Sequence, residues 1–437
     1  MSETDKDRSR AVPSGRLSRM ARFGGLGISL AGSAAAKSVG ATLTGRKADW
    51  SDLIFTPGAA RRFADELAHL RGAALKLGQL VSMDAGAMLP PEFSDVAARL
   101  RANADPMPPR QLRQVLETGW GKDWRSRFAQ FEVRPAAAAS IGQVHRAVTK
   151  DGRRLAIKVQ YPGVRKSIDS DVDNVATLIK LSGLLPSGLD IKPLLAEAKQ
   201  QLHEEADYRR EAEHLDRYAT AISGDDRFVI PSVETSLSGD TILAMDWLHG
   251  QGIETVAKQS ASERQRVFEA LLDLTLHELF SMKLMQTDPN YANFLYAGSA
   301  QPIGLIDFGA VRAIDESLSE AYRAVLRAGL GQDDHDLEEA LIGLGVIATT
   351  TPEAFRAGTV ALAREAFSYL DAPEFDFTDT SLAQTLREGG LALQKQGFNH
   401  APPPPLMFIQ RKLGGLFLLG ARLEIRMDLR SWLERWA

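Results

Sequence analysis

Two turn-forming stretches between residues 286 and 309 carry side chains suited to proton transfer and metal binding. Asp288 and Asn293 lie in the first stretch, and the triplet Asp307-Phe308-Gly309 follows an aliphatic run in the second. A positioned carboxylate can accept a proton from a hydroxyl group or a water molecule. Mg²⁺ prefers oxygen ligands, and the side chains of Asn293 and Asp307 supply two of them. We therefore predict that Asp288 is a catalytic base and that Asn293 and Asp307 bind a metal ion.

An aliphatic stretch further upstream carries a cationic candidate, Lys158. If Ala156-Ile157-Lys158 forms a strand, its side chains alternate, so that Ile157 faces the core and Lys158 shares the opposite face with Ala156. A strand lysine taken alone usually faces solvent. Phosphoryl-transfer enzymes, however, use a fixed cation of this kind to hold the α- and β-phosphates of ATP. Lys158 is therefore predicted to bind ATP, provided that a carboxylate orients it.

The orienting carboxylate is expected on an acidic helix, which the pattern places over residues 191–218. Acidic helices are usually only solvated faces. Glu205 and Glu211 are six residues apart, about 240° around a regular helix, and cannot both pair with one lysine. Two separate carboxylate roles suggest two cations, which Lys158 and Lys76 could supply. The acidic residues of the helix are Glu204, Glu205, Asp207, Glu211 and Glu213.

The elements around Lys158 follow a recognisable order. A small-residue, turn-like loop covers residues 136–143, an alternating strand 144–149 follows, and Lys150-Asp151-Gly152 is a hairpin signal before the strand 155–160. A kinase N-lobe has this order, and the five-residue interval from Asp288 to Asn293 is that of a kinase catalytic loop. The chain is therefore predicted to have an α+β, bilobal protein-kinase-like fold that holds Mg²⁺–ATP between Lys158 and the Asp307 turn.

Several ordinary kinase features are missing. No Gly-x-Gly-x-x-Gly precedes Lys158, no His-Arg precedes Asp288, and no Ala-Pro-Glu follows Asp307. Lys76-Leu77-Gly78-Gln79 instead stands far upstream, on a predicted helix over residues 59–83. Together these features resemble the UbiB (AarF-domain) atypical kinases linked to ubiquinone biosynthesis, and most closely the branch with the mitochondrial coenzyme Q members. The matching stretches are 12–14, 22–26, 76–79, 136–145, 156–160, 205–212, 288–294, 307–309 and 410–415.

The resemblance implies roles for individual residues. Lys158 would pair with Glu211 as a catalytic pair and hold the phosphates of ATP. Lys76 and Gln79 would lie across the cleft where a peptide substrate would otherwise sit, near Glu205 and Asp207, as an autoinhibitory motif. The residues expected to contact the nucleotide are Ala136, Ala137, Ala138, Ala139, Ser140, Lys158 and Met245.

The resemblance also implies a function: an Mg²⁺-dependent ATPase that acts on membrane-embedded ubiquinone precursors or on their enzymes. A phosphotransferase for a protein or a small lipid, and a nucleotide-binding scaffold without turnover, are the alternatives. Asp288 argues against the scaffold, because binding alone does not need that carboxylate. A kinase of the aminoglycoside or choline type would share the two turns but would not explain 76–79. The expected location is the cytoplasmic face of the inner membrane, or the matrix side in mitochondria.

Composition and charge divide the chain into four blocks. Residues 1–50 are a basic lead, 51–124 a helical extension with the Lys-x-Gly-Gln motif, 125–250 the N-lobe, and 251–437 a mostly helical C-lobe. The net charge of -4 gives no attraction to nucleic acid, and the lack of cysteine excludes disulfides. No stretch reaches transmembrane length. The lead is either a solvated tail or a segment that binds an anionic membrane surface reversibly; its eight basic residues are Arg8, Arg10, Arg16, Arg19, Arg22, Lys37, Arg46 and Lys47.

Overall fold

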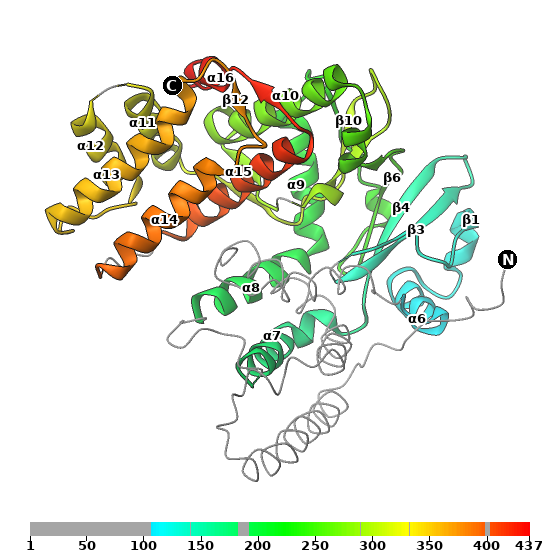
Figure 1. Cartoon of the computed structure of the whole chain (residues 1–437). Helices are drawn as coiled ribbons and strands as arrows, with labels where there is room; N and C mark the ends of the chain where they lie inside the picture. Colours follow the sequence, from blue (N-terminus) through cyan, green and yellow to red (C-terminus); the bar gives the residue numbers. More distant parts are fainter. Residues whose placement is uncertain (1–105, 140, 182–191, 289, 332, 398–402) are drawn as a thin grey trace, which may run out of the picture. The chain divides into compact units, whose positions relative to one another are not determined.

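The computed structural model describes residues 106–437 except 140, 182–191, 289, 332 and 398–402 (Figure 1). The described chain forms two compact units. Unit 1 contains residues 106–213 and Ser232–Trp247, and unit 2 contains His214–Pro231 and Leu248–Ala437. The basic lead, the helix expected over 59–83, and the motif residues Lys76 and Gln79 lie outside the described residues, as does Ser140.

Unit 1 is built on an antiparallel five-stranded sheet. Its order is β1-β3-β4-β6, with β2 paired to a second stretch of β3. The predicted hairpin is confirmed: Ala147 pairs with Leu155, and Gly152 in the connecting turn has φ 88°, which a glycine adopts without strain. The strands are β1 (Phe128–Phe131), β2 (Ala137–Ala138), β3 (Gly142–Thr149), β4 (Arg154–Gln160) and β6 (Ile242–Asp246).

A hydrophobic core covers one face of this sheet. Helix α6 (Pro109–Trp120) begins with a proline at N1, where the missing N–H costs no hydrogen bond. Its Leu112 and Leu116 pack against Ile157 and Val159 of β4. A fully buried side chain of this size contributes about 1.5–3 kcal/mol. The core thus fixes the side of β4 that faces away from Lys158.

Unit 1 also contains the helices α7 and α8, the short helical turns η2 and η3, and the first part of α9, which continues into unit 2. The prediction of one continuous acidic helix is wrong, because α8 ends at Glu205 and α9 begins at Tyr208. Asp207 lies between them and its Oδ1 accepts a hydrogen bond from the backbone N–H of Arg210, so it caps the second helix. The 240° separation of Glu205 and Glu211 therefore does not apply. The elements are η2 (Trp124–Arg127), α7 (Val164–Leu181), α8 (Lys192–Glu205), α9 (Tyr208–Ala221) and η3 (Thr235–Leu237).

Unit 2 is mostly helical. Helix α10 begins with an N-cap, since the hydroxyl oxygen of Ser260 accepts a hydrogen bond from the backbone N–H of Glu263. The helical elements are η4 (Ile253–Lys258), α10 (Ala261–His277), the π-helical turn η5 (Glu278–Met282), η6 (Tyr291–Asn293), α11 (Glu316–Leu330), α12 (Asp334–Leu344), α13 (Glu353–Ser368), η7 (Tyr369–Asp371), α14 (Ser381–Lys395), α15 (Pro404–Arg422) and α16 (Leu429–Glu434).

Short strands of unit 2 interrupt the helices at the turn-rich stretch. One sheet has the order β5-β10-β9-β7, and two further pairs are β8 with β11 and β12 with β13. Residues 214–231 belong to this unit, unlike in the predicted blocks, because the second half of α9 and strand β5 pack there. The strands are β5 (Phe228–Val229), β7 (Gln251–Gly252), β8 (Leu284–Gln286), β9 (Phe294–Tyr296), β10 (Ile303–Leu305), β11 (Val311–Ala313), β12 (Phe375–Asp376) and β13 (Arg426–Met427).

Candidate nucleotide site

Lys158 and Glu211 form a buried ion pair in unit 1. The ammonium Nζ of Lys158 lies 2.7 Å from Oε1 and 3.0 Å from Oε2 of Glu211, so the carboxylate is engaged through both oxygens. The side chains are only 9% and 1% exposed. Nζ also lies 5.4 Å from the centre of the Tyr208 ring, which is within the range of a cation–π contact. The pair therefore holds a cation at a fixed place on the sheet.

The local sequence explains why this pair forms. Strand alternation places Ile157 in the core and turns Lys158 to the other face, as predicted. The cap at Asp207 starts α9 in such a way that Glu211, in its first turn, reaches the lysine. Glu205 is half-buried at the end of α8, on the far side of the helix break.

The small-residue segment forms an edge of the same sheet. Ala137 and Ala138 make up β2, and Ala136 and Ala139 hydrogen-bond through their N–H groups to the carbonyls of Val144 and Gly142. Ala136 to Ala138 are exposed, and Ala139 is half-buried.

Two further residues of the sheet bear on the predicted nucleotide contacts. Met245 lies on β6, is buried, and pairs with Ala156 of β4. Gly142 lets β3 approach β4 closely, because a Cβ there would lie 2.3 Å from the carbonyl oxygen of Val159. The contacts of Met245 and of the alanine segment with a nucleotide remain predictions.

Sequence reasoning missed a buried histidine beside this segment. Nδ1 of His145 donates to the carbonyl of Glu132 at 2.9 Å, and Nε2 lies 2.8 Å from Nε2 of Gln143, which therefore donates to it. Oε1 of Gln143 in turn accepts the N–H of Met107 at 2.9 Å. This chain of bonds requires a neutral imidazole. Burial lowers the pKa of His145 from 6.5 to about 4, although the Glu132 carbonyl opposes the shift. The signal was available, since residues 143 and 145 share one face of a strand.

Acid should destabilise the protein through His145. Its pKa is lower in the folded state, so the unfolded chain takes up the proton first; the stability is complete above about pH 6.5 and is lost as the pH falls towards 4. Between pH 7 and pH 5 we expect the free energy of unfolding to fall by about 2 kcal/mol.

Urea unfolding of the wild type and of His145→Gln at both pH values measures this fall. The glutamine variant should show a smaller pH dependence, and His335→Gln, at an exposed site on α12, should behave like the wild type. Equal slopes in all three proteins would contradict the assignment.

In unit 2, the backbone brings Asp288, Asn293 and Asp307 onto adjoining turns. Strands β8 and β11 pair, and just beyond them the N–H and the hydroxyl of Thr287 both donate to the carbonyl of Ala310, at 3.0 and 2.7 Å. Strands β9 and β10 also pair, and the N–H of Ile306 donates to the carbonyl of Asn293 at 3.1 Å. Two short strand pairs therefore position the turns that carry the three predicted residues.

Each of the two aspartates shapes its own turn. Oδ1 of Asp288 accepts the N–H of Asn290 at 3.3 Å, and Oδ1 of Asp307 accepts the N–H of Gly309 at 3.0 Å. Phe308 is buried, and its ring lies 5.1 Å from that of Tyr218 on α9. The carbonyl of Phe308 accepts a hydrogen bond from Nδ1 of His214 at 3.3 Å. The turn of Asp307 is thus held by packing as well as by its own hydrogen bonds.

The side chains at this place suit a magnesium ion. Asn293 is buried, and its side-chain Nδ2 has no hydrogen-bond partner among the described residues. Within its described part, the structure has no group of three or more His, Cys, Asp or Glu side chains that could hold a metal ion. Mg²⁺ typically binds through one or two protein oxygens and completes its shell with phosphates and water. One amide and one carboxylate from Asn293 and Asp307 fit that habit.

Asp307→Asn should abolish most of the effect of Mg²⁺ on nucleotide affinity. Loss of a group that hydrogen-bonds to a metal ligand typically lowers metal affinity by about 10- to 100-fold. Loss of the charge of a ligand itself should lower the affinity by at least as much. Calorimetric titration of ATP with Mg²⁺ and with EDTA measures the effect. Asp315→Asn, at the exposed cap of α11, should leave both affinities unchanged. Equal affinities of the wild type with Mg²⁺ and with EDTA would refute the metal site.

Within the described residues, no helix is long and apolar enough to cross a membrane.

Comparison with known proteins gives a family. The family model described as "ABC1 atypical kinase-like domain" matches residues 99–341. The atypical kinase COQ8, mitochondrial, of Saccharomyces cerevisiae is 35% identical over 426 residues, which cover 96% of this chain and 85% of the relative. The atypical kinase COQ8B, mitochondrial, of Rattus norvegicus is 36% identical over 435 residues, which cover 98% of this chain and 81% of the relative.

A solved structure supports the fold alone. The Mycobacterium tuberculosis protein Rv3197, determined in complex with erythromycin, aligns with a TM-score of 0.57 and 24% identity, over 86% of this chain and 94% of that protein. The prediction of an α+β kinase-like fold is confirmed. The domain description matches more than half of the chain, and both relatives exceed 30% identity over nearly all of it. The chain therefore belongs to the ABC1 (UbiB) family of atypical kinases.

Proposed function

We propose that this protein binds ATP with Mg²⁺ and hydrolyses it in support of ubiquinone biosynthesis. The observation that carries the proposal is the placement of Asp288, Asn293 and Asp307 on adjoining turns of unit 2. The buried pair of Lys158 and Glu211 in unit 1 supports it. These are the five side chains that nucleotide chemistry of this kind requires.

The chain's own residues would divide the work. Lys158, held by Glu211, would bind the α- and β-phosphates as a fixed charge. Asn293 and Asp307 would hold the metal ion, which when bound neutralises charge on the phosphate oxygens. Asp288 would orient the attacking hydroxyl or water and take its proton.

Water is the acceptor that we favour. The alanine segment 136–139 stands where ordinary kinases have a glycine-rich loop. Alanine disfavours φ > 0, so this backbone has fewer accessible conformations than a glycine loop. A replacement of glycine by alanine has a free-energy effect of order 1 kcal/mol. The heavier argument is the Lys76–Gln79 motif, which lies outside the described residues. A helix with Lys76 over the acceptor side would exclude a protein hydroxyl but admit water.

The link to ubiquinone comes from the relatives and from the basic lead. The two mitochondrial relatives are named COQ8 and COQ8B, and these names point to coenzyme Q. Eight cationic side chains without an acidic neighbour between residues 8 and 47 would favour a peripheral position on an anionic membrane. We propose lipid precursors of ubiquinone and their enzymes as partners. The location would then be the cytoplasmic face of the inner membrane, or the matrix side in mitochondria.

The test uses the full-length protein. Phosphate release from ATP would be measured with Mg²⁺ and with EDTA, each with and without anionic vesicles that carry a phenolic ubiquinone precursor. Magnesium-dependent release that rises with these vesicles is the expected result. Absence of magnesium-dependent phosphate release under all of these conditions would refute the proposal.

Phosphoryl transfer to a protein or a lipid is the second candidate. A base at Asp288 would serve a hydroxyl acceptor as well as water. In the same reactions, γ-labelled ATP distinguishes the two, because transfer leaves label on protein or lipid whereas hydrolysis leaves it in free phosphate. Nucleotide binding without either product would favour a scaffold.

A further inference from the structure

Four buried polar side chains in unit 2 take no part in the chemistry described above. Tyr218, Glu278, Gln286 and Lys412 are 1%, 0%, 5% and 5% exposed. They come from α9, from the first residue of η5, from the last residue of β8 and from the middle of α15. We call this set the Lys412 cluster.

Glu278 is the centre of the cluster. Its Oε1 accepts hydrogen bonds from the hydroxyl of Tyr218 at 2.7 Å and from the backbone N–H of Gln286 at 2.9 Å. Nζ of Lys412 lies 3.3 Å from Oε2 of Glu278 and donates to the side-chain oxygen of Gln286 at 3.2 Å. Among the described residues, Oε2 has this ion pair and no hydrogen bond. Gln286 is therefore held by its backbone and by its side chain at once.

Stability alone does not account for such a cluster. Burial raises the pKa of Glu278, and the Lys412 ammonium opposes that shift; burial also raises the pKa of Tyr218 well above 10, so the phenol remains a donor. A buried ion pair stabilises a fold no better, on average, than well-packed apolar residues of the same volume. What a buried polar network does supply is a defined geometry.

The geometry that the cluster defines lies directly before the candidate base. Gln286 ends β8, and the next residue, Thr287, donates two hydrogen bonds to the carbonyl of Ala310. Asp288 follows Thr287 in the chain. The position of Gln286 therefore sets where the Asp288 turn begins.

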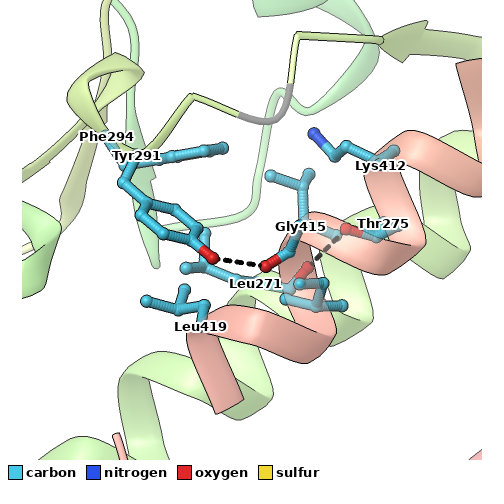
Figure 2. Close-up of a pocket in the computed structure, with 9 residues that line it drawn as sticks. Leu271, Thr275, Tyr291, Phe294, Lys412, Gly415 and Leu419 are labelled. Atoms are coloured by element: carbon cyan, nitrogen blue, oxygen red, sulfur yellow. Dashed lines mark hydrogen bonds between the residues drawn. The ribbon is translucent and has the colours of Figure 1, made fainter. Parts of the chain in front are cut away.

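The same helix, α15, also contacts the far side of this turn. The hydroxyl of Tyr291 donates to the carbonyl of Gly415 at 2.6 Å, and Figure 2 shows Gly415 and Lys412 on one helix with Tyr291 opposite. An apolar cavity of about 20 Å³ lies beside Lys412 and Gly415, lined also by Leu271 and Phe294. It has room for little more than one water-sized group. The cavity is therefore too small for a nucleotide or a lipid. The role of α15 here is to contact the turn.

We propose that Lys412 is a positioning residue for Asp288, on which it acts through Gln286. The proposal rests on the proposed function, because it assigns to Asp288 the role of the base. Lys412 touches neither nucleotide nor metal in this arrangement. It clamps the end of β8 from α15, so that the turn presents the carboxylate at one place.

The test is Lys412→Met in the full-length protein, which removes the ammonium and keeps most of the side-chain volume. We expect kcat for ATP turnover to fall by about tenfold or more, because a displacement of about 1 Å at a catalytic group costs up to about 10²-fold. KM for ATP should change by less than about threefold, since ground-state binding is untouched. Amide hydrogen exchange should become faster in residues 284–296 and stay unchanged in β4.

Two further variants separate positioning from folding. Ile409→Ala, at a fully buried residue of the same helix, should lower thermal stability without a change in kcat or in exchange at 284–296. Glu278→Gln combined with Lys412→Met removes both charges and should fold even where the single variant does not. It also lacks the ammonium bond to Gln286, so its kcat should stay low.

Wild-type kcat in the folded double variant would overturn the proposal. So would a uniform increase of exchange throughout unit 2 in Lys412→Met, because that pattern marks a general loss of stability. Absence of ATP turnover in the wild type would instead refute the proposed function. The exchange at 284–296 needs no ATP, and would then decide by itself whether Lys412 holds the turn.

Discussion

Asp288→Asn is expected to lower the rate of ATP turnover by about 10²- to 10⁴-fold, the range typical of a lost general base. Asparagine keeps the shape of the side chain and retains an oxygen for the N–H of Asn290, which lies 3.3 Å away in the native turn. The turn should therefore persist. Nucleotide affinity should change by less than about threefold, because a base acts in the reaction and not in the ground state. Phosphate release and calorimetric titration measure the two effects.

Asp333→Asn is the matched control for this substitution. Oδ1 of Asp333 accepts the N–H of His335 at 2.8 Å, which is the same local pattern as in Asp288 and Asn290, but it caps α12. Turnover should be unchanged in this variant. If Asp288→Asn also released phosphate at the wild-type rate, the activity would belong to another base or to a contaminating ATPase.

The second large effect is expected at Lys158. Lys158→Met should lower the free energy of unfolding by about 3–5 kcal/mol, because it leaves the carboxylate of Glu211 buried without its cation. Nucleotide affinity should fall by about 10- to 100-fold, since a hydrogen bond to a charged group is worth about 1.5–3 kcal/mol. Urea unfolding and ATP titration measure these two quantities.

A double variant separates the two roles of Lys158. Lys158→Met with Glu211→Gln removes both charges and should recover most of the lost stability. Its affinity for ATP should stay low, because no ammonium remains to bind the phosphates. Recovery of the affinity together with the stability would reduce Lys158 to a structural ion-pair partner.

An exposed pair supplies the control for the loss of a lysine charge. Lys199 lies 2.6 Å from Asp173, and their side chains are 28% and 61% exposed. Lys199→Met should change the free energy of unfolding by less than about 1 kcal/mol and leave ATP affinity unchanged. A change as large as that of Lys158→Met would mean that burial is not the source of the effect.

Local patterns predicted the elements that carry the candidate site. The hairpin of β3 and β4 follows from an Asp-Gly turn between alternating runs, which involves contacts only a few residues apart. The same alternation predicted the face of Lys158. The turns of Asp288 and Asp307 were found by their spacing, since the interval of five residues from Asp288 to Asn293 is a property of the chain itself.

The acidic helix shows where such patterns fail. Its residues suggest one helix, and only the cap at Asp207 divides it into α8 and α9. Asp is a preferred cap, but nothing local decides whether a particular Asp caps a helix or faces water. The break changes which carboxylate can reach Lys158. From residues alone the choice among five acidic side chains stayed open, and the resemblance supplied Glu211.

By itself, the sequence determined the kinase-like order of elements, the candidate oxygen ligands, the candidate base and the strand face of the lysine. Only the tertiary structure decided which distant groups meet: Lys158 with Glu211, 53 positions along the chain, and Lys412 with Gln286, 126 positions along it. It also decided that His145 is buried and neutral. The physical reason is that periodicity and spacing report on neighbours within a few residues, whereas burial and ion pairing depend on contacts that exist only after the chain has closed long loops.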